Sequence, residues 1–448
     1  RVPAFRRCGT KTQSASEYVE KIRSDTIRRS TAPRHADAQD YHAVQRKAAG
    51  EDGRNVIFNN IIMKLVYIYH SIAAKGGLER IFCDKMNYFV QNCGYDVTFI
   101  SYQQGKHPLA YKLDERIKVV DLNTRFIELY KYNAILRVFK NYFLRKLLKK
   151  RLSRQLSEER PDLVICTTVD LSINECFMDL PYSFIIESHL FMDRVLDANI
   201  HEAHGLKRCF LNFIDKWHIK KFNKAKVLVT LTRADKKDWS KHLSTDIRVI
   251  PNMVTYYPER IKPYNERPNR IICAGRLDSH KGFNYIIEAW SMIAHKYNNW
   301  RIDIFGHGEE EIKLNNLIEI KNLCDCIKIH KPSDNIYNEY LNSSLYVLSS
   351  KSEGFGLVLI EALSCGVPCI SFNCPNGPAE IIRHGENGIL VPLADVEKLA
   401  ESIEWMITHK DDRFRMSSNA RLTAEQYQAD TIMPQWVKLF EDVINSAT

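Results

Sequence analysis

The sequence lacks the features of a membrane-spanning, disulfide-stapled or zinc-binding protein. No run of about 18 apolar residues occurs in it, although a helix needs about 20 to cross a bilayer. The first residues lack the charged and then apolar pattern of a secretory signal. The twelve cysteines include no C-x2-C pair, and some, such as Cys166 and Cys273, lie inside apolar runs. We therefore expect a cytoplasmic protein with reduced thiols and no metal site.

A complete dinucleotide fingerprint is also missing. The stretch "FGHGEEE" at 305–311 supplies Gly-x-Gly after an expected strand but no third glycine. Because the fingerprint needs that glycine where the helix packs on the strand, the sequence does not predict NAD binding.

The chain has 448 residues, 45% of them hydrophobic, which is too long for one ordinary core and too apolar for a disordered protein. Its formal net charge of +10 is uneven, since residues 1–62 hold twelve Lys or Arg and seven Asp or Glu. This polar stretch is typical of an N-terminal extension that is disordered or not native to the fold, and we assign it no function. Met63 then opens "MKLVYIYHS", the expected start of the first buried strand.

Residues 63–250 alternate short apolar runs with longer amphipathic ones. The short runs are rich in β-branched and aromatic residues, as buried parallel strands are. They lie at 64–70, 95–101, 117–121, 162–167, 183–187 and 226–231. Between them come stretches such as "GGLERIFCDKMNYFVQNCG", whose apolar residues recur at helical spacing. The repeat predicts a doubly wound, Rossmann-like α/β domain.

The same alternation restarts after "TYYPERIKPYNERPN", a Pro-rich and charged stretch typical of a linker. Strands are expected at 270–275, 300–305, 327–330, 345–350 and 368–372, with helices at 281–297, 309–322, 334–342 and 357–364. Residues 251–430 thus predict a second Rossmann-like domain, and residues 431–448 a helix that packs back on the first domain. Ligands of such folds bind at the carboxyl ends of the strands, here in a cleft between the domains.

The most informative stretch is "SEGFGLVLIE" at 352–361. It predicts a loop with a Gly-Phe-Gly turn between a strand and a helix. The glycines let the backbone approach a ligand, and the free amides at the helix start favour a phosphate. Glu353 and Glu361 flank this helix start, so they are spaced to hold the two ends of a sugar nucleotide. The alternative is a pair of solvated glutamates beside a buried helix.

Cations and glycines follow the first strand of each expected domain. Arg276 and Lys281 in "ICAGRLDSHKGF" lie where two cations would clamp a diphosphate. Gly76 and Gly77 occupy the corresponding loop of the first domain, where their amides would meet the same diphosphate from the opposite wall. An ordinary pair of surface cations and a simple turn are the alternatives.

His189 in "SFIIESHLF" comes just after an expected strand of the first domain, and hence near the cleft. There it is placed to hydrogen-bond a donor-sugar hydroxyl or to position an acceptor. A structural histidine with satisfied partners is the alternative.

Together these stretches resemble the retaining glycosyltransferases of family four, of the polysaccharide-biosynthesis type. The resemblance covers roughly residues 63–448 and rests on "GGLE", "VIPN", "AGRL" with "KG", "SEGFGLVLIEALSCGVP" and "GPAEIIRHGENGILV". It implies the GT-B fold, in which two doubly wound Rossmann-like domains face each other across an interdomain cleft.

Transferred residue by residue, the resemblance implies a donor site built from both domains. Arg276 and Lys281 would neutralise the donor diphosphate, and Glu361 would hold the nucleotide ribose. Glu353 would grip donor-sugar hydroxyls near the reacting centre, with His189 on the other side. The backbone amides that would bind sugar or phosphate belong to Gly76, Gly77, Gly354, Phe355, Gly356, Leu357 and Val358.

The implied activity is transfer of a hexose or N-acetylhexosamine from a nucleotide sugar, with a UDP-sugar favoured, to a saccharide acceptor. The stretch "NCPNGPAE" is similar to a variant in enzymes of capsule and O-antigen synthesis, which points to a bacterial glycan and a lipid-linked acceptor. No metal and no other cofactor is expected. A sugar-nucleotide epimerase, a sugar phosphorylase of the same fold and a non-catalytic sugar-nucleotide-binding protein are the alternatives.

Residues 129–157 contain nine Lys or Arg and no acidic residue, interleaved with apolar side chains at helical spacing. Such a helix suits an anionic membrane surface, and we expect peripheral association with the inner face of the cell membrane. The alternative is a solvated helix whose apolar side joins the core. Nucleic acid is not an expected partner, because the sequence contains no recognised nucleic-acid-binding module.

Overall fold

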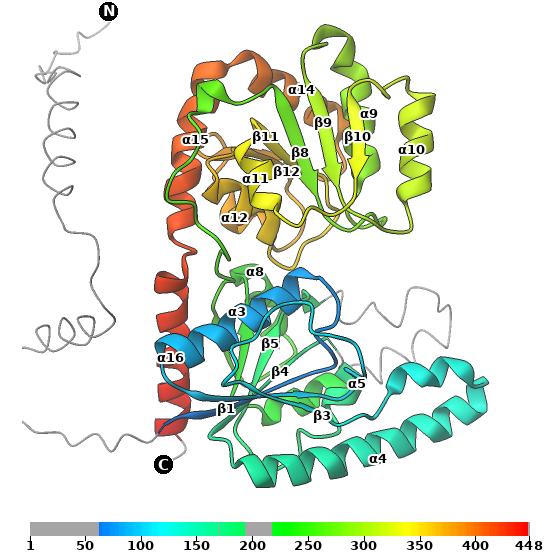
Figure 1. The fold of residues 1–448 in the computed structure, drawn as a ribbon, viewed down its shortest axis with the longest axis vertical. Helices are drawn as coiled ribbons and strands as arrows, with labels where there is room; N and C mark the ends of the chain where they lie inside the picture. Colours follow the sequence, from blue (N-terminus) through cyan, green and yellow to red (C-terminus); the bar gives the residue numbers. More distant parts are fainter. Residues whose placement is uncertain (1–61, 170, 193–216, 447–448) are drawn as a thin grey trace, which may run out of the picture. The chain divides into compact units, whose positions relative to one another are not determined.

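The computed structural model describes residues 62–446 except residue 170 and residues 193–216 (Figure 1). The predicted N-terminal extension, residues 1–62, lies outside the described residues apart from Ile62. Two parallel β-sheets organise residues 62–446, one in each half of the sequence. We call each sheet with its helices the N-terminal lobe and the C-terminal lobe.

The N-terminal lobe holds a seven-stranded sheet in the order β3-β2-β1-β4-β5-β6-β7. Its strands are β1 (Lys64–Tyr69), β2 (Asp96–Ser101), β3 (Lys118–Asp121), β4 (Leu163–Thr167), β5 (Phe184–Ser188), β6 (Val227–Thr230) and β7 (Asp246–Val249). The helices described between them are α3 (Gly77–Asn92), η1 (Phe126–Lys131), α4 (Ala134–Glu159), α5 (Leu171–Asn174), η2 (Phe222–Lys224) and α8 (Arg233–Trp239).

The C-terminal lobe holds a six-stranded sheet in the order β10-β9-β8-β11-β12-β13. Its strands are β8 (Arg270–Ala274), β9 (Arg301–Phe305), β10 (Ile327–His330), β11 (Leu345–Leu348), β12 (Cys369–Phe372) and β13 (Gly388–Val391). Its helices are η3 (Tyr264–Glu266), α9 (Phe283–Ile293), η4 (Ala294–Lys296), α10 (Glu311–Ile320), α11 (Ile336–Leu341), α12 (Leu357–Ser364), α13 (Pro378–Ile381), α14 (Val396–Thr408) and α15 (Lys410–Glu425).

The central strands of both sheets are buried on their two faces, which explains the unbroken apolar runs in the sequence. In β1, Leu65 and Tyr67 join a hydrophobic cluster on one face, whereas Val66 and Ile68 join a second cluster on the other. All strands are parallel, but the order in which the chain adds them to the sheet reverses between β1 and β4, and between β8 and β11. These are the topological switch points at which doubly wound sheets bind ligands.

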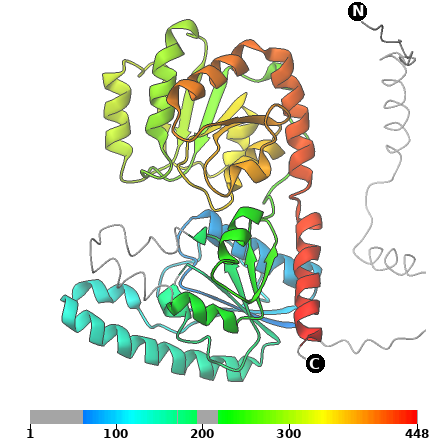
Figure 2. The same cartoon turned by 180° about the vertical axis from the view of Figure 1, so that it is seen from behind.

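The last described helix, α16 (Ala429–Asn445), returns to the N-terminal lobe. Ile432, Met433 and Trp436 share one buried cluster with Leu65 of β1 and Phe89 of α3. Figures 1 and 2 show α16 running beside the N-terminal sheet. The end of the chain thus contributes side chains to the core of its first half.

The predicted basic helix is divided in the structure. Residues 126–131 form the short helix η1, and α4 begins only at Ala134, where the Asn133 side chain accepts a hydrogen bond from the Leu136 amide at 3.0 Å. Asn133 is therefore an N-cap, which separates the two helices. Strands β7 and β13 and helices α14 and α15 were not among the predicted elements.

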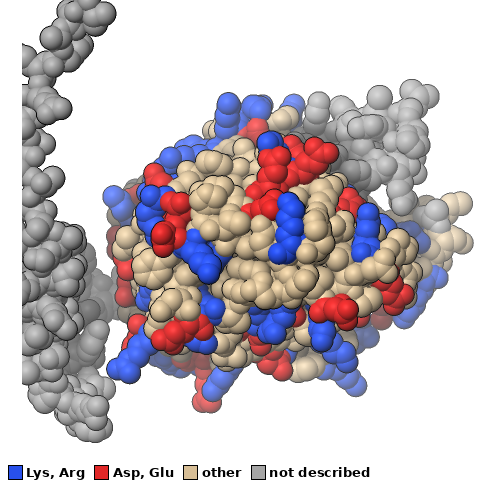
Figure 3. Space-filling view, turned by 90° about the horizontal axis from the view of Figure 1, so that it is seen from above, with Lys and Arg blue, Asp and Glu red and all other residues tan. Residues whose placement is uncertain are grey.

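Charge is mixed on the face of the C-terminal lobe that is uppermost in Figure 1. Figure 3 shows Lys and Arg side chains interspersed there with Asp and Glu. Within the described part of the chain, no helix is both long enough and apolar enough to cross a membrane.

Candidate active site

The predicted donor-binding residues come from two neighbouring strands of the C-terminal lobe. Strand β8 pairs with β11 through Ile271 and Leu345. Arg276 follows the end of β8, and Glu353 lies in the loop between β11 and α12. Because both strands are parallel, their carboxyl ends meet at one edge of the sheet, and the two loops lie side by side.

Lys281 and Glu353 form an ion pair across these two loops. Nζ of Lys281 lies 2.7 Å from Oε1 of Glu353, and the Glu353 side chain is 10% exposed. Backbone contacts hold the loops together, since the Lys351 amide donates to the carbonyl oxygen of His280 at 2.8 Å. Gly282 has a φ of +60°, and a Cβ there would collide with the carbonyl oxygen of Ser349. Glycine is needed at this position for both reasons.

Arg276 is held by a neighbour that the sequence analysis did not single out. Its Nε donates to Oδ2 of Asp278 at 2.7 Å, while the Arg276 side chain remains 65% exposed. The other Asp278 oxygen accepts from the amides of His280 and Lys281 at 3.0 and 3.1 Å. Burial opposes ionisation of Asp278, yet Arg276 and these amides hold its pKa below the ordinary value. Asp278 therefore shapes the turn that carries both predicted cations.

Helix α12 begins at Leu357, directly after the Gly-Phe-Gly turn. Gly356 is its N-cap, with a φ of +96°. The amides of Leu357 and Val358 belong to the first turn, where a helix offers them no partner of its own. Phe355 differs from this pattern because its side chain is 3% exposed and packs in the core against Tyr427. Only the backbone of Phe355 is suited to a ligand.

Glu361 lies one turn into α12 and is buried. The Tyr340 hydroxyl donates to its Oε2 at 3.4 Å. Burial raises the pKa of Glu361 to about 7, although Arg80 of the N-terminal lobe lowers it. The guanidinium of Arg80 also lies 5.7 Å from the ring centre of Tyr337 on α11. Arg80 thus reaches the Glu361 region from the other lobe.

The glycine pair of the N-terminal lobe faces the start of α12. A Cβ on Gly77 would lie 3.1 Å from Cδ1 of Leu357. Gly76 is the N-cap of α3 and has no side-chain cap. The glycine pair thus lies beside the first residue of α12, and the Gly76 amide donates to the Ala74 carbonyl oxygen at 3.1 Å. Binding of a shared diphosphate by these amides stays a prediction.

His189 also meets the C-terminal lobe. A Cβ on Gly354 would collide with the His189 carbonyl oxygen, so these two backbones are in close contact. The His189 ring follows β5, and its Nε2 lies 2.7 Å from Oε2 of Glu187. The structure thus brings His189 next to Gly354 and its neighbour Glu353, although His189 is far from both in the sequence.

Sequence reasoning misses Arg80 and Tyr337 because they reach the Glu361 region from distant segments. Asp278 lies only two positions from Arg276, which it contacts. Glu187 likewise lies two positions from His189, so in both cases the local spacing is a signal that could have found the residue.

A second contact between the lobes involves the "NCPNGPAE" stretch. Within the C-terminal lobe, the backbone of Glu353 forms an isolated parallel β-bridge with that of Asn376. A Cβ on Gly377 would collide with the carbonyl oxygen of Phe355 in the same lobe. Further on, Oε1 of Glu380 accepts a hydrogen bond from the Arg233 amide of α8 at 2.9 Å. This stretch supports the Glu353 loop and connects it with the N-terminal lobe.

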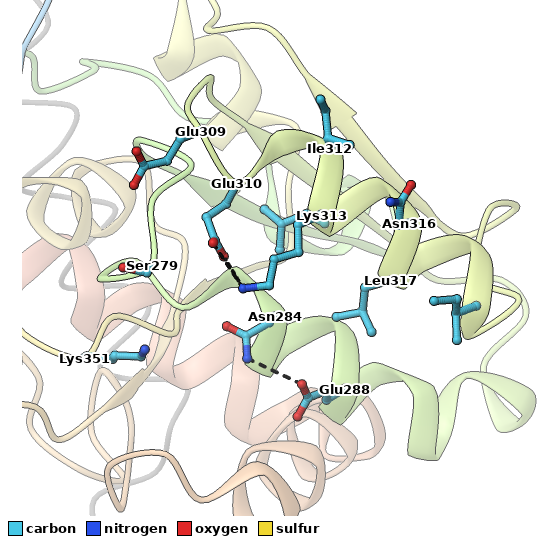
Figure 4. Close-up of a pocket in the computed structure, with 12 residues that line it drawn as sticks. Ser279, Asn284, Glu288, Glu309, Glu310, Ile312, Lys313, Asn316, Leu317 and Lys351 are labelled. Atoms are coloured by element: carbon cyan, nitrogen blue, oxygen red, sulfur yellow. Dashed lines mark hydrogen bonds and ion pairs between the residues drawn. The ribbon is translucent and has the colours of Figure 1, made fainter.

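A cavity of about 590 Å³ lies elsewhere in the C-terminal lobe, between α9 and α10 (Figure 4). Ser279 and Lys351 lie at its border. Among the residues that line it, Asn284 donates a hydrogen bond to Glu288, and Lys313 donates one to Glu310. None of the predicted site residues lines this cavity. The convergence of loops from both lobes, rather than this cavity, identifies the candidate active site.

Residues 259–423 match the family model described as "Glycosyl transferases group 1". The match supports the glycosyltransferase group 1 family. It contains Arg276, Lys281, Glu353 and Glu361, whereas Gly76, Gly77 and His189 lie outside it.

Two relatives extend the similarity to most of the chain. An uncharacterized glycosyltransferase of Haemophilus influenzae is 29% identical over 379 residues, which cover 83% of this chain and 98% of the relative. The amylovoran biosynthesis glycosyltransferase AmsD of Erwinia amylovora is 25% identical over 388 residues, which cover 85% and 99%.

The fold has the same support from a solved structure. A mutant of TarM from S. aureus, in complex with fondaparinux, alpha-GlcNAc-glycerol and UDP, superimposes with a TM-score of 0.65 at 16% identity, covering 85% of this chain and 100% of that one. The two Rossmann-like lobes of this chain are a GT-B fold, which confirms the predicted fold class.

Proposed function

We propose that the protein is a retaining glycosyltransferase that transfers a hexose or N-acetylhexosamine from a nucleotide sugar to a saccharide acceptor. The observation that carries the proposal is the Lys281–Glu353 ion pair beside the first turn of α12, opposite the glycine pair of the other lobe. This arrangement places a cation for the diphosphate, a carboxylate for sugar hydroxyls and free amides together at the carboxyl edge of the C-terminal sheet. The UDP bound by TarM makes a UDP-sugar the favoured donor.

The mechanism follows from where charge develops. Breaking the bond between the anomeric carbon and the diphosphate oxygen leaves negative charge on the nucleotide and positive character on the sugar. Arg276, Lys281 and the amides at the start of α12 stabilise the leaving diphosphate. The Glu361 carboxyl group accepts hydrogen bonds from the ribose hydroxyls. The Glu353 carboxylate accepts hydrogen bonds from the hydroxyls of the donor sugar. The acceptor hydroxyl attacks the face that the diphosphate leaves and gives its proton to the departing diphosphate oxygen, so the anomeric configuration is retained.

No metal and no other cofactor takes part in this proposal, because cations and amides of the chain compensate the diphosphate charge. Nucleotide release should therefore continue in the presence of EDTA. Loss of activity in EDTA that Mg²⁺ or Mn²⁺ restores would contradict this part of the proposal.

The acceptor we propose is a lipid-linked saccharide in the synthesis of a bacterial glycan of the capsule or O-antigen kind. The relative AmsD, which is named for amylovoran biosynthesis, supports this class of product. A lipid-linked acceptor also requires access to a membrane surface, for which α4 provides the strongest candidate.

Helix α4 has two different halves. Leu148, Leu152 and Leu156 are fully buried, so its second half packs on the N-terminal lobe. Its first half instead exposes an apolar surface made of Ile135, Val138, Phe139, Tyr142 and Phe143, each more than half exposed. We call these five residues the α4 apolar surface. Figures 1 and 2 show this end of α4 extending beyond the sheet.

Cations accompany the α4 apolar surface. Nζ of Lys140 lies 4.5 Å from the ring centre of Tyr132, and Nζ of Lys146 lies 4.5 Å from that of Tyr142. Aromatic rings beside Lys and Arg suit the boundary between lipid headgroups and acyl chains. We therefore propose that the enzyme works at the inner face of the cell membrane, bound to anionic lipids. Nucleic acid is not proposed as a partner.

The test of the catalytic proposal is an assay of the full chain with a panel of UDP-sugars and GDP-sugars and a bacterial lipid extract. We expect acceptor-dependent nucleotide release and, by NMR, a product with the anomeric configuration of the donor. Conversion of the donor without acceptor would indicate an epimerase, and a requirement for inorganic phosphate would indicate a phosphorylase. Binding of a nucleotide sugar without turnover of any donor would indicate a non-catalytic protein.

A further inference from the structure

The buried carboxylate of Glu187 forms a hydrogen bond with the His189 ring. Glu187 is the fourth residue of β5, is 1% exposed, and uses its two oxygens for different partners. Oε2 lies 2.7 Å from Nε2 of His189, and Oε1 lies 2.5 Å from Nζ of Lys85 on α3. Lys85 is itself 3% exposed. The three side chains form a continuous line from the core of the N-terminal lobe to the candidate active site.

Helix α16 contacts Lys85, the residue at the end of this line opposite His189. The Lys85 ammonium lies 3.5 Å from the ring centre of Trp436 on α16 and 5.9 Å from that of Tyr67 on β1. A cation over the face of a tryptophan is favourable, above all when water is excluded. Lys85 is therefore balanced by the Glu187 carboxylate on one side and by aromatic faces on the other.

The end of β5 is fixed on its opposite face as well. Ser188 points away from Glu187, because side chains alternate along a strand. Its hydroxyl donates to Asp235 at 3.1 Å and accepts from the Trp239 indole at 3.0 Å. The Phe82 and His189 rings pack in a T-shaped arrangement, with 5.3 Å between their centres. These contacts leave the backbone at His189 little freedom to turn.

An ion pair in a core is costly unless each partner is well satisfied, and an apolar pair would serve packing equally well. The histidine gives the pair a further consequence. Burial opposes ionisation of Glu187, yet Lys85 and His189 hold its pKa below the ordinary value. An ionised carboxylate only accepts hydrogen bonds, so Nε2 of His189 carries a proton and Nδ1 is the ring nitrogen left for a ligand.

We propose that Glu187 and Lys85 are positioning residues that fix the orientation and the Nε2-protonated tautomer of His189, so that Nδ1 is presented to the donor sugar or acceptor hydroxyl. Lys85 neutralises the carboxylate, and Trp436 couples this arrangement to the C-terminal helix. The inference rests on the proposed function only where it assigns His189 a role in transfer. Its statement on the tautomer concerns the chain alone.

The experiment combines nitrogen NMR of the histidine rings with kinetics of the full chain. In ¹⁵N-histidine-labelled protein without substrate, the His189 signals are assigned by their loss in His189→Gln. We expect the wild-type ring in the Nε2–H form and a mixture of tautomers in Glu187→Gln. Glu187→Gln leaves the Lys85 charge unpaired in the core and could therefore unfold the protein. The double variant Lys85→Met/Glu187→Gln removes both charges, so it tests the tautomer without a buried unpaired charge.

In the transfer assay, Glu187→Gln and the double variant should lower kcat at least about tenfold, with the KM for the donor changed less than about threefold. Lys85→Arg should keep most of the activity, since it preserves the charge. The matched control is Glu175→Gln, whose buried carboxylate contacts His218 and Lys221 rather than a predicted site residue. It should lower thermal stability without this loss in kcat.

One result would overturn the positioning proposal, and a second would instead correct the proposed function. An Nδ1–H ring in the wild type, or a tautomer that Glu187→Gln does not alter, would refute the positioning role. The expected tautomer shift combined with full turnover in His189→Gln would keep the arrangement but remove His189 from the reaction, and so would correct the proposed function instead.

Discussion

Nζ of Lys281 lies 2.7 Å from Oε1 of Glu353, although 72 positions separate the two residues in the sequence. The pair joins the loop after β8 to the loop before α12, at the switch point of the C-terminal sheet. A donor diphosphate would compete with Glu353 for the ammonium, which would release the carboxylate for the sugar hydroxyls. If the proposed function holds, binding of the leaving group and binding of the sugar would be coupled through this one contact.

The first prediction concerns this carboxylate. Glu353→Gln should lower turnover at least about 10²-fold, because the amide cannot accept hydrogen bonds from the donor sugar as strongly as the carboxylate. The measurement is nucleotide release at saturating donor. The matched control is Glu310→Gln, which breaks the 3.1 Å Lys313–Glu310 pair of the same lobe and should leave turnover within about twofold. An equal effect of both substitutions would contradict a catalytic role for Glu353.

The second prediction concerns the contact between the lobes at Gly354. In Gly354→Ala the new methyl group meets the His189 carbonyl oxygen, a backbone atom that cannot rotate away. We expect kcat/KM to fall about 10²-fold, since a small displacement of reacting groups has effects of that size. Gly77→Ala should cause a smaller loss, because its methyl group meets a flexible leucine side chain at 3.1 Å. The reverse order of the two effects would contradict the described contact between the lobes.

The third prediction is a pH dependence of stability. Burial raises the pKa of Glu361 to about 7, so the folded state favours the protonated carboxyl. The stability that this preference contributes is complete below about pH 4.5 and is lost as the pH rises through about 7. Relative to Glu361→Gln, the free energy of unfolding of the wild type should fall by about 2 kcal/mol between pH 5 and pH 8. Urea titrations at the two pH values measure it, and parallel changes in both proteins would contradict it.

The fourth prediction concerns the α4 apolar surface. The double variant Phe139→Asp/Phe143→Asp should reduce binding to vesicles with anionic lipid at least about tenfold, because it replaces two exposed rings and adds repelling charge. The control Ile312→Asp/Ile320→Asp alters two residues of α10 that are 77% and 75% exposed, and it should bind as the wild type does. Vesicle flotation measures both. Wild-type binding that is equal on neutral vesicles, or that occurs on duplex DNA instead, would contradict the membrane proposal.

Much of the fold could be predicted because buried parallel strands leave a plain trace in sequence. Helix α12 lies at 357–364 as predicted, and β8 and β10 differ from their predicted ranges by at most one residue. Strand β7 escaped prediction because it is four residues long and half of its side chains are exposed or charged, as in Asp246 and Arg248. A strand at the edge of a sheet lacks the apolar run that marks a central one.

Apart from Glu361, which is predicted from its spacing to Glu353, the candidate site could be predicted where its residues come after strands. Arg276, Lys281 and Glu353 do so, and glycines mark their loops. Lys85 and Glu187 did not stand out, because a lysine inside an amphipathic helix predicts a solvated residue. Their 2.5 Å contact joins positions 102 residues apart, and no local pattern encodes such a pairing. For Phe355 the sequence predicts only a backbone amide at the ligand, and the structure adds that its side chain is 3% exposed and belongs to the core.

The central claim is that Arg276 and Lys281 bind the diphosphate of the donor nucleotide. Calorimetric titration of UDP and GDP into the full chain, and into Arg276→Ala/Lys281→Ala, tests it without any knowledge of the acceptor. We expect the nucleotide that binds the wild type to lose at least about 10²-fold in affinity, since two charge-assisted contacts are removed. The nucleoside without phosphates should bind both proteins equally. Undiminished binding of the nucleoside diphosphate by the double variant would contradict the claim.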